Sequence, residues 1–183
     1  MLKNQLIYLF SILFLAVGCS EKPATVKTSE ENSKQAETQN DHGHSHTPHH
    51  GIEAKLYSDQ QAAGIAELKL HDDKGDLELW LTNRDEAHSP LDLGLDTKIT
   101  VKFISLEGKE VQLQVRNKDK NEDEDGMGNI RNSKTNYFIF PGDTKADSTF
   151  LIGKEFSAEV QISFNIGDKV YQSKKFQLKP HVH

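Results

Sequence analysis

The chain has 183 residues, of which 35% are hydrophobic and 27% charged, and its formal net charge is −6 at pH 7. This size and composition favour one folded domain with polar flanking segments, and the negative charge argues against nucleic acid as a partner. Because the chain has a single cysteine, an intrachain disulfide is excluded.

Residues 1–18 have the pattern of an export signal. One basic residue, Lys3, precedes an apolar run over residues 6–15, which is short for a membrane span. The motif Ala-Val-Gly-Cys at residues 16–19 resembles the lipobox of bacterial lipoproteins, although that family often has Leu at the first position. The resemblance implies cleavage before Cys19 and its acylation, so that lipid anchors the mature protein in the bacterial cell envelope. The alternative is an ordinary cleaved signal.

The serine that follows the cysteine resembles an outer-membrane sorting signal of some bacteria, and it favours the outer membrane, facing the periplasm. Residues 19–40 are rich in Glu, Lys, Ser, Thr, Gln and Asn and contain few apolar side chains. Such a segment cannot bury enough surface to offset the entropy of ordering, so we expect a disordered tether.

Residues 41–51 form a histidine-rich tract, with imidazoles at His42, His44, His46, His49 and His50. Neutral imidazole is a common ligand of Zn, Cu(II), Ni and Co, so the tract predicts a divalent-metal site. Ordering the flexible backbone costs entropy, which predicts modest affinity and fast exchange. The alternative interpretation is a solvated polar spacer.

Residues 52–180 alternate between polar and apolar side chains in short runs separated by turn residues. About seven such runs predict an all-β fold, an immunoglobulin-like antiparallel β-sandwich, with a small barrel as the alternative. Residues 58–64 are the exception, because a capping Ser58 and a terminal Gly64 predict a brief helix. Trp80 falls on the face opposite the leucines, where we expect a half-buried surface residue or a contact with the tract.

Two further segments carry polar side chains of interest. Residues 117–132 begin like an EF-hand calcium loop, but Asn132 stands at the twelfth position and predicts a solvated acidic loop instead. Residues 181–183 form a tail with His181 and His183, which is a second set of nitrogen donors or a frayed end. If the domain brings its two ends together, this tail joins the tract.

The tract and residues 51–65 resemble the amino-terminal region of periplasmic adaptor proteins of heavy-metal efflux pumps of the resistance-nodulation-division class. Residues 71–81 are similar to the small His-rich domain that some of these adaptors carry. The resemblance implies periplasmic handling of Zn, Co, Cd, Ni or Cu, with an efflux pump as partner. A full adaptor also needs a long helical hairpin and a lipoyl-like domain. This chain has the pattern of neither, so the resemblance implies a stand-alone metal-binding module.

These patterns together predict a lipid-anchored periplasmic protein that buffers or delivers a divalent metal in heavy-metal efflux or homeostasis. Borderline divalent ions are favoured over Cu(I), because soft sulfur ligands are nearly missing. Zn is the first candidate, with Cu(II), Ni and Co as alternatives. The tract and tail would supply the ligands, with His71 as a further option. An enzyme is not expected, because no nucleophile–base motif or phosphate loop is visible. The alternative function is a cell-envelope β-sandwich that binds a protein partner and has no metal role.

Overall fold

The computed structural model describes residues 47–142 and 145–181, and the structural findings below concern these residues. The predictions for the signal peptide, the tether and the side chains of Cys19, His42, His44, His46 and His183 lie outside them. Within the described ranges, no helix has the length and apolar character that crossing a bilayer requires.

The described part of the chain is built from antiparallel strands, which confirms the predicted all-β class. The larger sheet has nine strands in the order β6-β5-β10-β11-β1-β2-β3-β9, with β12 paired to β10. Their bounds are β1 (Ile52–Ser58), β2 (Gln61–Leu70), β3 (Leu77–Thr82), β5 (Ile99–Phe103), β6 (Lys109–Leu113), β9 (Tyr137–Phe140), β10 (Ala158–Ile166), β11 (Lys169–Ser173) and β12 (Phe176–Leu178). A small sheet contains β4 (Leu93–Gly94), β8 (Lys134–Thr135) and β7 (Ile130–Arg131), and η2 (Thr149–Leu151) is a single 3₁₀ turn.

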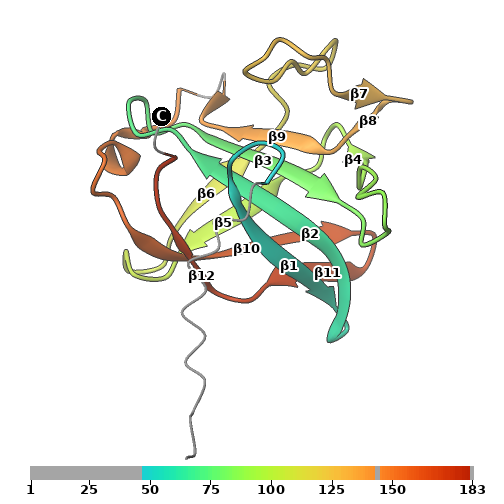
Figure 1. Cartoon of the computed structure of the whole chain (residues 1–183), viewed down its shortest axis with the longest axis horizontal. Coiled ribbons are helices and arrows are strands. Elements are labelled where there is room, and N and C mark those ends of the chain that lie inside the picture. The colour runs from blue at the N-terminus through green and yellow to red at the C-terminus, as the bar shows by residue number, and fades with distance from the viewer. Residues whose placement is uncertain (1–46, 143–144, 182–183) are drawn as a thin grey trace, which may run out of the picture. The chain divides into compact units, whose positions relative to one another are not determined.

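The larger sheet curls until its two end strands meet, which gives a barrel- or sandwich-like arrangement (Figure 1). Beyond β6, Gln114 and Ile139 of β9 exchange both backbone hydrogen bonds, at 2.9 and 2.8 Å. Successive side chains of a strand point to opposite faces, so every second residue faces the enclosed core. In β5, for example, Ile99, Val101 and Phe103 are fully buried.

The middle strands β2 and β3 are buried on both faces. Their leucines form part of the main core, as the alternation predicts: Leu68, Leu70, Leu77, Leu79 and Leu81. On the outer face, however, Glu67, Lys69, Glu78 and Trp80 are also buried, with exposed fractions of 3 to 6%. The outer face is therefore covered by other parts of the chain, and this cover forms the candidate site.

The prediction of a helix over residues 58–64 is wrong, because these residues form the tight turn between β1 and β2 and the start of β2. Asp59 and Gln60 have positive φ angles of 51° and 65°, and Ser58 pairs with Gln61 across the turn. Two consecutive positive φ angles are the conformation that closes two-residue hairpins. The segment was too short for its apolar spacing to distinguish a helix from a strand, and Gly64 belongs to the inward-facing positions of β2.

Candidate metal site

The last residues of the histidine-rich tract pack against the outer face of β2 and β3. The His49 ring stacks on Trp80, with ring centroids 4.0 Å apart and planes 3° from parallel. The backbone N–H groups of His49 and Gly51 both donate to Glu67 Oε1, at 2.9 Å each. Trp80 is therefore buried against the tract and is not a half-buried surface residue.

The last residues of the tract and His181, the first residue of the C-terminal tail, lie next to one another near the end of β2. The backbone N–H of His181 donates to the carbonyl oxygen of Leu70 at 2.9 Å, so His181 lies beside the end of β2. There the ring of His181 stacks on that of His50, with centroids 5.4 Å apart. We call His50 and His181 the histidine pair. Two predicted ligands from opposite ends of the chain are thus neighbours.

A second group of ligand-type side chains lies close by, and we call it the inner cluster: His71, Glu78 and Glu124. His71 directly follows β2, Glu78 is in β3, and Glu124 comes from the long loop between β6 and β7. His71 Nε2 lies 2.9 Å from Glu78 Oε2 and 3.6 Å from Glu124 Oε2. Among the described residues, this is the one set of three such side chains whose ligand atoms all lie within 4.8 Å of one another.

The remaining carboxylate oxygens of the inner cluster are held by neighbours. The Tyr137 hydroxyl donates to Glu78 Oε1, and the ammonium group of Lys69 donates to Glu124 Oε1. Tyr137 is fully buried, so its contact with Glu78 is shielded from solvent, whereas the contact of the buried Lys69 with Glu124 is partly exposed. Each carboxylate therefore presents its second oxygen to His71 in a fixed orientation.

Charge in the inner cluster follows from these contacts. Its hydrogen bond to Glu78 raises the pKa of His71 above the ordinary value of 6.5, against the effect of partial burial. Burial alone would raise the pKa of Glu78, but the hydrogen bonds from His71 and Tyr137 outweigh it and leave that pKa below its ordinary value. Burial, followed by the hydrogen bond to Glu78, raises the pKa of Tyr137 far above its ordinary range. Near neutral pH, Glu78 is thus an anion and Tyr137 a neutral donor.

Most of the acidic loop is exposed, as expected, but one of its residues anchors it to the domain. Asn121 is fully buried, and its side-chain amide donates to Thr135 Oγ1 and to the carbonyl oxygen of Tyr137, at 3.0 and 2.9 Å. This anchor directs the loop back over β2 and β3, so Glu124 reaches Lys69 and His71. Of these three ligand-type side chains, only His71 is a candidate from the sequence, and the sequence does not predict Glu78 and Glu124 as ligands.

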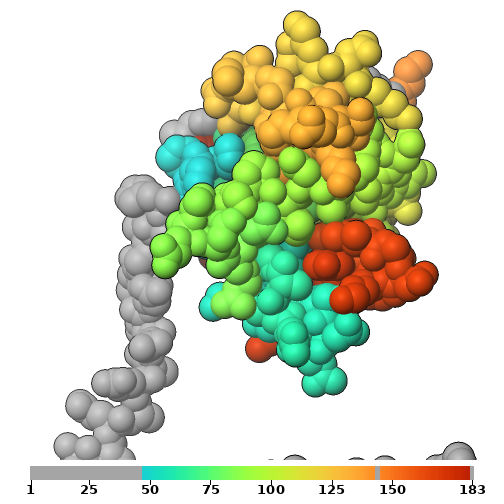
Figure 2. All heavy atoms as spheres, turned by 90° about the vertical axis from the view of Figure 1, so that its right-hand side faces the viewer, coloured from blue at the N-terminus to red at the C-terminus, as the bar shows by residue number. Residues whose placement is uncertain are grey.

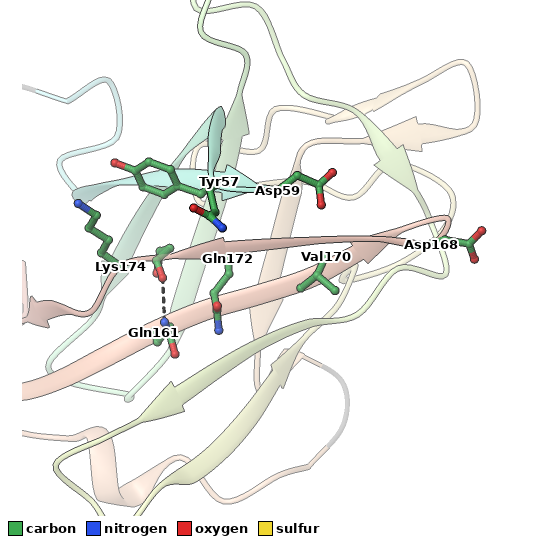
Figure 3. A pocket seen from close by; sticks show the side chains of 9 residues that line it. Tyr57, Asp59, Gln161, Asp168, Val170, Gln172 and Lys174 are labelled. Atoms are coloured by element: carbon green, nitrogen blue, oxygen red, sulfur yellow. Dashed lines mark hydrogen bonds between the residues drawn. The ribbon is translucent and has the colours of Figure 1, made fainter.

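A separate hollow of about 670 Å³ lies at the C-terminal end of β1, whereas the tract precedes the N-terminal end of that strand. In Figure 2, the blue-green tip of the β1–β2 hairpin lies at the bottom of the coloured part, and the orange-red β10–β11 hairpin lies beside and above it. In Figure 3, Tyr57 and Asp59 line this hollow from one hairpin, and Gln172 and Lys174 from the other. It contains no histidine, and its described carboxylates do not form a three-ligand group. The metal-ligand chemistry of the described residues is therefore concentrated at the other end of β1.

No protein-family model, curated protein or solved structure matches this chain. Its function is inferred below from its residues and their arrangement.

Proposed function

We propose that the protein is a lipid-anchored periplasmic protein that binds a divalent transition metal and buffers or delivers it in heavy-metal efflux or homeostasis. The ligands come from the tract and the tail, and acylated Cys19 holds the protein at the outer membrane. The observation that carries this proposal is the contact between His50 and His181, whose ring centroids lie 5.4 Å apart.

Both members of the histidine pair have a fixed backbone. The N–H group of His50 donates to the carbonyl oxygen of Thr47 at 3.1 Å, and that of His181 donates to Leu70. Two imidazoles positioned in advance reduce the entropy that an ion must offset when it orders its ligands. A flexible tract without such an anchor would lack this advantage.

Two of the other predicted ligands are close to the pair along the chain. His46 is four residues from His50, a distance that an extended chain spans in at most about 14 Å, and His183 is two residues from His181. A tetrahedral site needs four ligands, and nitrogen donors suit Zn²⁺ as well as Cu(II), Ni and Co. The tract and tail offer imidazole and no thiolate, which favours borderline divalent ions over Cu(I), and Zn is the first candidate among them. The ion is then cargo for an efflux pump or another acceptor in the envelope.

Replacing His50 and His181 together by alanine is expected to weaken Zn²⁺ binding at least tenfold. Disturbing a residue that only orients a ligand already costs about 10- to 100-fold in affinity, and this variant removes two ligands. Calorimetric titration of the protein with Zn²⁺, Ni²⁺ and Cu²⁺ measures the change.

His88→Asn is the matched control for this titration. His88 is exposed, lies outside the site and has a φ of 47°, a conformation that Asn adopts readily. Its affinity should equal that of the wild type. Unchanged binding in the His50/His181 variant, and also in a variant without all seven tract and tail histidines, would refute the proposed function.

A further inference from the structure

We propose that the inner cluster is a second divalent-metal site, distinct from the tract and tail. It would take an ion of the Zn²⁺, Co²⁺ or Mn²⁺ type through one imidazole nitrogen, from His71, and two carboxylate oxygens, from Glu78 and Glu124. The site uses none of the residues that carry the proposed function, so either inference can fail without the other.

The spacing of the three ligand atoms matches a metal centre. Zn–N and Zn–O bonds are about 2.1 Å long, so the ligand atoms of a tetrahedral site lie about 3.4 Å from one another. His71 Nε2 is 2.9 Å from one carboxylate oxygen and 3.6 Å from the other. All three ligand atoms lie within 4.8 Å of one another, so an ion could enter after shifts of about 1 Å in the positions of the three side chains.

The ligands have the supporting contacts that metal sites use. Hydrogen bonds to the outer atoms of ligating groups fix their orientation and raise affinity. Tyr137 supplies such a bond to Glu78, and Lys69 supplies one to Glu124. The two contacts leave Glu78 Oε2 and Glu124 Oε2 facing His71, and an ion would take the place of the proton between His71 Nε2 and Glu78 Oε2.

The cluster opens on a hollow of about 350 Å³, which gives an ion and its remaining water ligands a way in. Four carboxylates line the hollow, against two cationic side chains, Lys74 and Arg116. This excess of negative charge raises the local concentration of cations. With Lys69, which pairs with Glu124, counted as well, the four carboxylates still outnumber the three cationic side chains.

Only a metal site predicts that neutralising one ligand removes one equivalent of bound ion. A purely structural ion-pair network predicts no change in stoichiometry. The test uses the full chain in a background without the tract and tail histidines. There His42, His44, His46, His50, His181 and His183 are replaced by alanine, and His49 by Phe to keep an aromatic ring on Trp80.

Co²⁺ is the probe, because its visible absorption reports its ligands, and calorimetry gives the stoichiometry. The background variant should bind one equivalent of Co²⁺. Adding Glu78→Gln or Glu124→Gln should weaken that binding at least about tenfold. Glu122→Gln is the matched control, because Glu122 lies on the same loop, pairs with Lys120 and does not contact the inner cluster. This control should bind as the background does.

Two results would overturn the inference. One is a background variant that folds and binds no Co²⁺, which leaves the proposed function of the tract untouched. The other is binding that Glu78→Gln and Glu124→Gln do not weaken. If the background variant does not fold, Glu124→Gln in the otherwise unchanged chain decides the question. Glu124 is 36% exposed, and this variant should bind one equivalent less than the wild type.

Discussion

The Gly75→Ala variant is expected to lose about 4 kcal/mol of unfolding free energy. Gly75 has a φ of 70°, and a Cβ atom there would lie 2.4 Å from the backbone oxygen of Ser148. That oxygen cannot move alone, because the N–H group of Leu151 binds it at 2.9 Å. The turn also carries the inner cluster, since the N–H of Gly75 donates to the carbonyl oxygen of His71. The variant should therefore displace His71 as well as destabilise the domain.

Gly126→Ala separates the clash from the backbone strain. Gly126 has nearly the same φ, 74°, but a Cβ atom there would meet no atom within 4 Å. A positive φ in a residue other than glycine costs about 1 kcal/mol or somewhat more. Urea unfolding followed by circular dichroism measures both variants. Equal losses in the two variants would show that the Ser148 contact does not constrain the turn.

Asn121→Ala is expected to lose about 3 kcal/mol, because it removes the anchor of the acidic loop. The Asn121 amide donates two buried hydrogen bonds, and its Oδ1 accepts a third from the backbone N–H of Arg116 at 2.8 Å. Leaving buried partners unsatisfied costs about 1 to 3 kcal/mol each, with some recovery through relaxation and water. The loop would also release Glu124 from Lys69 and His71.

Asn132→Ala is the matched control for this variant. Asn132 has the same φ, 49°, but its side chain is exposed. Its replacement should cost only the backbone strain, about 1 kcal/mol. The same urea experiment compares the two, and losses of equal size would mean that the buried hydrogen bonds of Asn121 contribute nothing to stability.

Much of the fold is predictable from the sequence, because the strands depend on local alternation. The leucines of β2 and β3 and the inward residues of β10 alternate strictly, and both sets are buried as expected. Residues 58–64 are different, because their capping residues suit a helix while a two-residue turn suits the sheet. Pairing along the whole β1–β2 hairpin, from Ile52–Leu68 to Ser58–Gln61, favours the turn over the helix. This pairing spans more residues than the seven whose local pattern suggests a helix.

The candidate site is less predictable, because it depends on contacts between distant segments. The register that places Leu70 opposite Leu77 also places Lys69 opposite Glu78, and this pair could have been read from the hairpin. Nothing local indicates that Glu124, 55 residues from Lys69, folds back onto it. The sequence predicts that His181 joins the tract only if the two ends of the domain come together. In the structure, the backbone hydrogen bond of His181 to Leu70 brings His181 next to His50.

The central claim is that a divalent ion binds where the tract and the tail meet, and Trp80 can report it. Trp80 is the only tryptophan of the chain, and the His49 ring stacks on it at 4.0 Å. Cu²⁺ quenches indole fluorescence at short range. The titration uses the Glu124→Gln variant, so that the inner cluster does not contribute. Cu²⁺ should give saturable, stoichiometric quenching in this variant. Quenching at the same concentrations should disappear when every tract and tail histidine except His49 is also replaced by alanine. Fluorescence that Cu²⁺ leaves unchanged, or quenches equally in both proteins, would contradict the claim.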